Sequence, residues 1–485
     1  MQKGIHYHET FSATPREGTA RILCALMCLL NLTRAAFDIT KAYCWADLPP
    51  GELIALKYPE GWKEFDKTTG EELFIVLRKN LFGHPAAGRT FGKQRDKALL
   101  EKFNEKGWNC SRTRMDPCLF VIAKDYQVGQ ISITKRLWML VHVDDAELVG
   151  ESELIVQEAL QVCKEIWDCS EVDSEFMLGV RRRITHSLVD GIQVVESVEC
   201  DMIAFVEGMH AAFKDHLPKG NVKEPVPPKF TTSILDELAD GEAKDVLDAG
   251  YMCAMGMLLW AARRIYTTCK VGVSVLCRVM SRPSWECFKV AMQMIAWIYQ
   301  NRTQGLKFTR NVCTLPLGLV DASNKPDPKD GKCQYGWVFM WMGAAVMDSS
   351  KKLRHIGLSS EHNEYMAMHF ARQALVWMRQ LFQEMGLEDL LSRPTVMLAD
   401  NKAANQRSRE DIVTCGHQYL YLPYHYNKEV QEEGYSKVQF VKSNENLADL
   451  LTKAPDTKTF LELKGALTGY DLRLIVKLWN ESYKE

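Results

Sequence analysis

The 15 cysteines of this 485-residue chain include no C-x-x-C pair, and the closest two, Cys24 and Cys28, lie in an apolar run. This absence argues against zinc ribbons and zinc knuckles, whose ligands come at short fixed spacings. The first twenty residues also lack the charged start and the cleavage site of a secretory signal. A disulfide framework would have no secretory context in which to form, so we expect reduced and mostly buried thiols.

Long hydrophobic runs and an excess of one charge are also lacking. No uncharged apolar run reaches the ~20 residues that a membrane-spanning helix needs. The 60 Lys and Arg nearly balance the 62 Asp and Glu, so any contact with nucleic acid must come from local patches. We therefore expect a soluble intracellular protein, located in the cytoplasm or the nucleus, that has no membrane partner.

What is present is an ordinary globular composition, with 46% hydrophobic residues and enough length for about three domains. Periodicity predicts a buried helix over Thr19–Asn31, two helices within Tyr251–Gln300 and a long helix over Glu364–Met385. A segment rich in Pro and Gly, Leu217–Pro228, predicts a domain boundary. The predicted strands are Arg34–Thr40, Leu73–Leu77, Trp138–Val143, Ala146–Gly150, Leu317–Asp321, Tyr335–Met340 and Thr395–Ala399.

A first group of carboxylates follows apolar strand residues. Asp38 ends one predicted strand, and Asp144 and Asp145 form the tip of a predicted hairpin. Adjacent carboxylates repel one another unless a cation neutralises them, and hard oxygen ligands suit Mg²⁺. This arrangement is typical of a two-metal phosphoryl-transfer centre. The alternative is an ordinary turn, because Asp is favoured in turns.

A second group lies at the ends of later elements: Asp321 and Asp400 end strands, and Glu364 and Asp449 begin helices. Four carboxylates at one sheet edge could hold two divalent ions and activate water for phosphodiester hydrolysis. The alternative is that Glu364 and Asp449 are first-turn acids favoured by the helix dipole, and that Asp321 is a turn former.

Two series of short strings follow one another along the chain. The first comprises GIHYHETFS (Gly4–Ser12), FDITKAYCWADLP (Phe37–Pro49), YPEGW (Tyr58–Trp62), LRKNLFG (Leu77–Gly83), DPCLF (Asp116–Phe120), HVDDAELVG (His142–Gly150) and FMLGV (Phe176–Val180). The second comprises VDAS (Val320–Ser323), SSEHNEYMA (Ser359–Ala367), VWMRQL (Val376–Leu381), LADNKAA (Leu398–Ala404) and NLADLLTKAP (Asn446–Pro455). The first series resembles the reverse transcriptase of copia-type retrotransposon (Pseudoviridae) Pol polyproteins, and the second resembles the ribonuclease H domain that follows it.

This resemblance implies roles for particular residues. Asp38 and Asp144 match the metal-binding carboxylates of the polymerase palm, and Asp145 is the adjacent third. Tyr43 matches the aromatic residue beneath the sugar of the incoming nucleotide. The four acids of the ribonuclease H centre are matched by Asp321, Glu364, Asp400 and Asp449.

The sequence also departs from the family pattern. His142 stands where a Tyr is usual, and Ala86 stands where the family has a Gln that helps to hold nucleotide. Arg89 and Lys93 remain as candidate phosphate contacts. The chain starts inside the region that corresponds to the fingers, so basic residues that bind the triphosphate are expected to be missing and nucleotide binding by the polymerase is expected to be weak.

Three other features have competing interpretations. The run Arg181–Arg183 is either a solvated edge or a contact to template and primer phosphates. The tryptophans Trp260, Trp285 and Trp297 are expected in the core rather than as platforms for base stacking. Irregularly spaced Cys415, His417 and His425 are expected to have structural roles rather than to bind zinc.

The resemblance implies an α+β fold: a right-hand polymerase with palm, fingers and thumb, followed by an α/β ribonuclease H-like domain. The expected divisions are a reverse transcriptase over residues 1–215, a linker and helical thumb or connection over 216–312, the ribonuclease H-like domain over 313–458 and a C-terminal tail over 459–485. Two Mg²⁺ ions, or Mn²⁺, are expected at each centre. The expected partners are an RNA template, a DNA primer, an RNA/DNA hybrid and deoxynucleoside triphosphates.

The implied activity is RNA-directed DNA polymerisation with hydrolysis of the RNA strand of hybrids. One alternative is a decayed or co-opted relic that binds nucleic acid without polymerising. The other is a protein whose only activity is nuclease. The oligomeric state is not indicated by any feature of the sequence.

Overall fold

The computed structural model describes residues 9–48, 51–228, 230, 242–408 and 421–484. The chain forms two compact units. Unit 1 comprises Met1–Arg16 and Leu32–Ser174, and unit 2 comprises Glu17–Asn31 and Glu175–Glu485. The division at residues 174 and 175 differs from the predicted divisions at 215 and 312.

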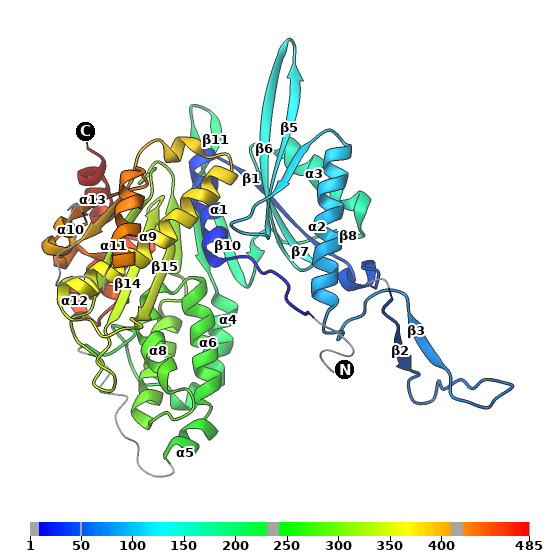
Figure 1. Cartoon of the computed structure of the whole chain (residues 1–485), viewed down its shortest axis with the longest axis horizontal. Helices are drawn as coiled ribbons and strands as arrows, with labels where there is room; N and C mark the ends of the chain where they lie inside the picture. Colours follow the sequence, from blue (N-terminus) through cyan, green and yellow to red (C-terminus); the bar gives the residue numbers. More distant parts are fainter. Residues whose placement is uncertain (1–8, 49–50, 229, 231–241, 409–420, 485) are drawn as a thin grey trace. The chain divides into compact units, whose positions relative to one another are not determined.

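Unit 1 is built on a six-stranded sheet in the order β4-β5-β6-β7-β1-β8, with antiparallel neighbours throughout. Helices α2 (Ala87–Glu105) and α3 (Glu153–Ile166) pack on the sheet and against each other (Figure 1). The predicted strand before Asp38 and the predicted hairpin are confirmed. The strands are β1 (Thr33–Ile39), β4 (Asn109–Arg112), β5 (Leu119–Val128), β6 (Ile131–His142), β7 (Asp145–Gly150) and β8 (Cys169–Glu171).

A separate two-stranded sheet in unit 1 pairs β2 (Ile54–Lys57) with β3 (Phe74–Leu77). The short 3₁₀ helix η1 (Ala42–Trp45) follows β1. Apolar spacing explains the helix packing: α3 buries Ile155, Val156, Ala159 and Leu160, as the 3.6-residue period of an amphipathic helix requires.

Unit 2 begins with α1 (Glu17–Leu30), which confirms the predicted helix over 19–31. Its residues 19–28 are all buried, because α1 packs against strands of both sheets in this unit. The four-stranded sheet has the order β12-β11-β10-β9. Its strands are β9 (Phe176–Met177), β10 (Val180–Val189), β11 (Ile192–Asp201) and β12 (Leu306–Thr309).

The helical part of unit 2 has more helices than expected. Three helices, not two, occupy Tyr251–Gln300, because the β-branched Ile265–Thr268 segment and Pro283 interrupt the helical pattern. Ser284 then caps α8 by accepting a hydrogen bond from the Cys287 amide. The helices are α4 (Ile203–Ala212), α5 (Glu242–Asp248), α6 (Tyr251–Arg264), α7 (Lys270–Leu276) and α8 (Trp285–Gln300).

The five-stranded sheet of unit 2 has the order β15-β14-β13-β16-β17. Strand β14 is antiparallel to both of its neighbours, β13 and β15, whereas β16 and β17 run parallel to β13. Helix α9 (Ser360–Glu384) packs across β13 and β14 (Figure 1). The strands are β13 (Leu317–Ala322), β14 (Gln334–Trp341), β15 (Ala344–Lys352), β16 (Thr395–Ala399) and β17 (Ser436–Phe440).

The segment predicted as a C-terminal tail, 459–485, is instead part of the fold of unit 2. Helix α12 (Thr457–Thr468) buries Leu463 and Leu467, and α13 (Arg473–Tyr483) buries Ile475 and Leu478. The Tyr483 hydroxyl donates to the Pro316 carbonyl and accepts from the Val396 amide. Unit 2 also contains α10 (Lys402–Arg407), α11 (Tyr421–Glu432) and the 3₁₀ helix η9 (Leu447–Leu451).

Candidate metal centres

The first acidic group lies in unit 1, where β1 meets the β6–β7 hairpin. Asp38 pairs with Asp145 in the antiparallel register of β1 and β7, and the Ile39 amide donates to the Asp144 carbonyl at 3.0 Å. Each of Asp38, Asp144 and Asp145 can place a carboxylate oxygen within 4.8 Å of the others. The sheet register therefore brings together residues that lie 106 positions apart.

The electrostatics of this group favour a cation. Partial burial and the charge of Asp144 raise the pKa of Asp38. Burial and the charges of Asp144 and Asp38 raise the pKa of Asp145. Ionised oxygens this close repel one another, and a hard divalent cation would relieve the repulsion. The donor set of this centre fits Mg²⁺ or Mn²⁺.

Tyr43 lies beside this group, on the four-residue 3₁₀ helix η1. Its ring packs 5.1 Å from Phe82 and 6.2 Å from Phe91, measured between ring centroids. Burial, followed by the charge of Asp144, raises the pKa of the Tyr43 hydroxyl. The residue therefore senses the acidic group electrostatically.

Arg89, a candidate phosphate contact, has partners within unit 1. Its guanidinium pairs with the carboxylate of Glu9 and donates to the Phe11 carbonyl at 3.3 Å. A phosphate could take the place of the Glu9 carboxylate because both are oxyanions suited to a guanidinium.

The second acidic group lies at one edge of the five-stranded sheet of unit 2. Asp321 is the next-to-last residue of β13, Asp400 follows β16, and Asp449 is in η9. These three residues can place carboxylate oxygens within 4.8 Å of one another. Asp321 and Asp400 also line a cavity of about 720 Å³. The central parallel pair β13 and β16 thus delivers two carboxylates to one edge, as expected for strands that end side by side.

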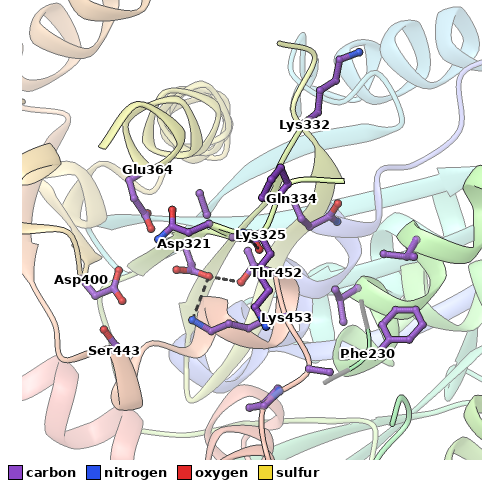
Figure 2. Close-up of a pocket in the computed structure, with 18 of the residues that line it drawn as sticks. Phe230, Asp321, Lys325, Lys332, Gln334, Glu364, Asp400, Ser443, Thr452 and Lys453 are labelled. Carbon is purple, nitrogen blue, oxygen red and sulfur yellow. Dashed lines mark hydrogen bonds and ion pairs between the residues drawn. The ribbon is translucent and has the colours of Figure 1, made fainter. Parts of the chain in front are cut away.

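Glu364 faces Asp321 and Asp400 in the same cavity, although it is outside the closest group of three (Figure 2). We predicted Glu364 at a helix start, but α9 begins at Ser360, where Ser359 caps it by accepting from the His362 amide. Glu364 is therefore in the second turn, where the helix-dipole explanation is weaker. Burial, then the charges of Asp321 and Asp400, raises its pKa well above the usual range.

Two residues of this centre, Thr452 and Lys453, were not identified from the sequence. The Thr452 hydroxyl donates to Asp321, and the Lys453 ammonium lies 2.9 Å from Asp449 Oδ2 (Figure 2 shows Thr452 and Lys453 reaching Asp321). The signal was present, because Lys453 follows Asp449 by four residues within NLADLLTKAP.

The buried acids of this group resist ionisation in spite of Lys453. Burial raises the pKa of Asp321, and Lys453 and Thr452 only partly oppose this. Burial and the charge of Asp321 raise the pKa of Asp449 to about 8. These buried carboxylates are held close together in spite of their mutual repulsion, so the site fits a divalent cation, as in the first group.

The arginine run and the three tryptophans singled out in the sequence lie in or near packed parts of unit 2. The arginines at 181 and 183 pair with carboxylates of β11, Asp201 and Glu199, and Arg182 is buried. The Arg181 and Arg183 side chains are 28% and 41% exposed, so the run is a partly solvated edge whose charges are paired with β11. Trp297 is in the core as predicted, but Trp260 and Trp285 are 40% and 39% exposed, which contradicts the prediction for these two.

The zinc candidates give no cluster in the part of the chain that the structure describes. Cys415 and His417 lie outside the described residues. Among the described residues, the only groups of three or more potential metal ligands are the two acidic groups. None of the described helices is long and apolar enough to cross a membrane.

Comparison with known proteins places the chain among retroelement sequences. It is 23% identical over 475 residues to the Retrovirus-related Pol polyprotein from transposon TNT 1-94 of Nicotiana tabacum, covering 97% of this chain and 33% of that protein. It is 22% identical over 458 residues to the corresponding polyprotein from transposon RE2 of Arabidopsis thaliana, covering 93% of this chain and 29% of that protein.

The chain is a relative of retrotransposon Pol polyproteins. The resemblance found in the sequence strings is thereby confirmed. This Pol-related chain spans about a third of the length of the curated relatives it matches. No protein-family model matches it.

Solved structures similar to parts of this Pol-related chain include two nucleic-acid complexes. LC11-RNase H1 in complex with an RNA/DNA hybrid is 14% identical, with a TM-score of 0.23, and the match covers 30% of this chain and 97% of that one. The foamy viral protease-reverse transcriptase in complex with dsDNA is 10% identical, with a TM-score of 0.39, covering 86% of this chain and 70% of that one.

Proposed function

We propose that this chain is an RNA-directed DNA polymerase with a fused ribonuclease H, derived from a copia-type element. The observation that carries the proposal is the presence of two separate groups of three carboxylates, each with oxygens within 4.8 Å. One group is at a strand and hairpin tip in unit 1, and the other is at a sheet edge in unit 2. The relationship to Pol polyproteins supports the assignment.

In unit 1, Asp38, Asp144 and Asp145 would hold two Mg²⁺ ions, or Mn²⁺. Bound divalent ions supply Lewis acidity that activates an attacking oxygen and stabilises a leaving one. Asp38 and Asp144 would orient the primer 3′ end and the triphosphate around this group. Tyr43 would lie under the sugar of the incoming deoxynucleotide, and Arg89 would exchange its Glu9 partner for a phosphate.

In unit 2, Asp321, Glu364, Asp400 and Asp449 would bind the metal ions that serve hydrolysis of the RNA strand in a hybrid. The sheet order, with three antiparallel strands followed by two parallel ones, supports a ribonuclease H-like domain over 313–458. The adjoining cavity of about 720 Å³ leaves room for the scissile phosphate and its neighbours.

The polymerase subdomains are part of the same proposal. The six-stranded sheet would be the palm, with β2 and β3 in the fingers. The reverse transcriptase would run through residue 215, and the helices within 216–312 would form the thumb or connection. The partners would be an RNA template, a DNA primer, an RNA/DNA hybrid and deoxynucleoside triphosphates.

One alternative is a protein that binds nucleic acid without polymerising. Ala86 at the position of the nucleotide-holding Gln, together with the pairing of Arg89 with Glu9, favours this alternative. A nuclease-only protein is the other alternative, since the second group does not depend on either feature.

Primer extension on an RNA template and cleavage of an RNA/DNA hybrid, both with Mg²⁺, test the proposal on one preparation. Asp144→Asn should abolish extension and spare cleavage, and Asp400→Asn should do the reverse, because each change removes a ligand from one centre. Extension that never exceeds the Asp144→Asn background contradicts the polymerase. Loss of both activities in folded Asp400→Asn contradicts the two-centre assignment.

A further inference from the structure

The turn that carries Asp144 contains a residue in an unfavourable backbone conformation. Val143 and Asp144 form the two-residue loop between β6 and β7, since His142 pairs with Asp145. Val143 has a φ of 56°, whereas Asp144 is not among the residues with positive φ. Positive φ at the first central position is the type II′ pattern, which prefers Gly there. A β-branched residue is strained in this conformation.

A buried arginine holds the carbonyl of this strained residue. Arg95 Nη1 donates to the Val143 carbonyl oxygen at 3.0 Å, and the Arg95 side chain is only 6% exposed. Arg95 lies on the buried stripe of α2, in register with the apolar Phe91, Leu99 and Phe103. An apolar side chain would complete that stripe without the cost of burying a charge. The position of Arg95 therefore calls for a role beyond packing.

The guanidinium is fixed from its other side. Arg95 Nε and Nη2 donate to Asp96 Oδ1 at 3.0 and 2.7 Å. Asp96 Oδ2 in turn accepts from Arg112 Nη1 on β4 at 2.5 Å. The contact between α2 and the turn is thus anchored to both the helix and the sheet.

We infer that Arg95 is a positioning residue, which holds the Val143–Asp144 turn in its strained conformation and thereby places the carboxylates of Asp144 and Asp145 for metal binding. The inference rests on the proposed polymerase centre but concerns a residue that touches neither metal nor substrate. Without the Arg95 contact the turn should relax, because nothing else described bonds to the Val143 carbonyl through a charged donor.

The test uses the whole chain in an Asp321→Asn/Asp400→Asn background, which removes two carboxylates of the second centre. Binding of Mn²⁺ is measured by electron paramagnetic resonance of the free ion. Hydrogen exchange of the peptide over 33–39 reports on the bond from the Ile39 amide to the Asp144 carbonyl. The variants are Arg95→Met, Val143→Gly, their combination, and Lys97→Met as an exposed control on α2.

Arg95→Met should weaken Mn²⁺ binding about tenfold and speed exchange at Ile39. Val143→Gly should recover both in the Arg95→Met protein, because Gly adopts positive φ without strain. Lys97→Met should match the parent. A merely structural Arg95 would give a loss that Val143→Gly does not recover, and this result, or no effect of Arg95→Met, would overturn the inference.

If Arg95→Met does not fold, as judged by thermal unfolding, Arg95→Lys replaces it in the same comparison. Lys keeps the charge but cannot hold Val143 and Asp96 with one planar fork. A parent without any Asp144-dependent Mn²⁺ binding would contradict the proposed centre itself. The exchange data would still decide whether Arg95 holds the turn, so the two failures are distinguishable.

Discussion

The ammonium nitrogen of Lys453 lies 2.9 Å from Asp449 Oδ2 and 3.9 Å from Asp321 Oδ2. Both carboxylates belong to the group of three that would hold metal in unit 2. The positively charged Lys453 side chain therefore lies beside two carboxylates that would bind a divalent metal ion. Like charges at this separation repel, so Lys453 and the metal should oppose each other.

Lys453→Met should lower the Mg²⁺ concentration that gives half-maximal hybrid cleavage, by roughly threefold to tenfold, since removal of about 1 kcal/mol of repulsion corresponds to this range. The measurement is initial cleavage rate across a Mg²⁺ titration at constant ionic strength. Lys458→Met, on the exposed side of α12, is the matched control and should not shift the titration. An unchanged or higher Mg²⁺ requirement in Lys453→Met would show that the ammonium assists the metal instead.

The metal-free protein should lose stability as the pH rises from about 4 to about 8. The folded pKa of Asp449 is about 8 against an ordinary 3.8, so unfolding releases its proton within this window. The contribution is fully present below the ordinary value and declines by up to ~1.4 kcal/mol per pH unit towards the folded value. Asp449→Asn should remove the Asp449 share of this dependence and leave the share of Asp321 and Glu364, whose pKa values are also raised. Thermal unfolding in EDTA at pH 5, 6.5 and 8 measures it.

Mg²⁺ should stabilise the parent protein most at pH 8, where the deprotonated carboxylates repel one another most strongly. It should stabilise the Asp449→Asn protein less. Parallel pH profiles for the two proteins in EDTA would contradict a raised pKa at Asp449.

Tyr43→Val should relax the preference for deoxynucleotides over ribonucleotides in primer extension. A ring beneath the sugar excludes a 2′-hydroxyl by a clash, and Val removes the clash. The ratio of kcat/KM for the two sugars measures the effect. If Tyr43 only packs against Phe82 and Phe91, activity towards both sugars falls together and the ratio does not move. Hybrid cleavage by the same protein controls for folding of unit 2.

Asp348→Asn should destabilise unit 2 by ~3–5 kcal/mol, the usual cost of removing one partner from a buried ion pair. Asp348 on β15 is buried and accepts from Arg21 of α1 at 2.8 Å and Lys270 of α7 at 2.7 Å. The change leaves a buried cation, Arg21, and a partly buried one, Lys270, without their carboxylate. The midpoint of urea unfolding measures the effect, and Glu286→Gln on the exposed face of α8 should leave it unchanged. A shift no larger than that of the control would mean that water or another group compensates.

Local pattern was sufficient for several parts of the fold. The apolar run of α1, the strands that precede Asp38 and Asp400, and the hairpin around Asp144 were all predicted within a few residues. These features depend on side-chain periodicity and turn preference, which act between near neighbours in the chain. The predicted start of α9, Glu364, was one turn too late. The Ser359 cap determines where the helix begins, whereas the apolar spacing does not.

Other features could not be predicted from the sequence, because they depend on contacts between segments that lie far apart in the chain. Trp260, Trp285 and Trp297 all lie on helices, yet only Trp297 is fully buried, and the other two are 40% and 39% exposed. Nothing in the local sequence after residue 458 predicts that this segment packs on the sheet. The packing depends on distant contacts, such as the hydrogen bonds of the Tyr483 hydroxyl with the Pro316 carbonyl and the Val396 amide. Burial is a property of the packed chain, and a helix pattern states only which face can be buried.

The sequence by itself determined which residue types end the strands that carry the two acidic groups: an Asp after each of several apolar runs, in strings similar to those of retroelement polyproteins. Only the tertiary structure decided which carboxylates meet, because β1 pairs with β7 across 106 residues and β13 with β16 across about 80. The tertiary structure also determined the positions of the positively charged side chains near the two acidic groups. Arg95 reaches the Val143 carbonyl and Lys453 reaches Asp321 through packing of whole elements, and no local pattern encodes those distances.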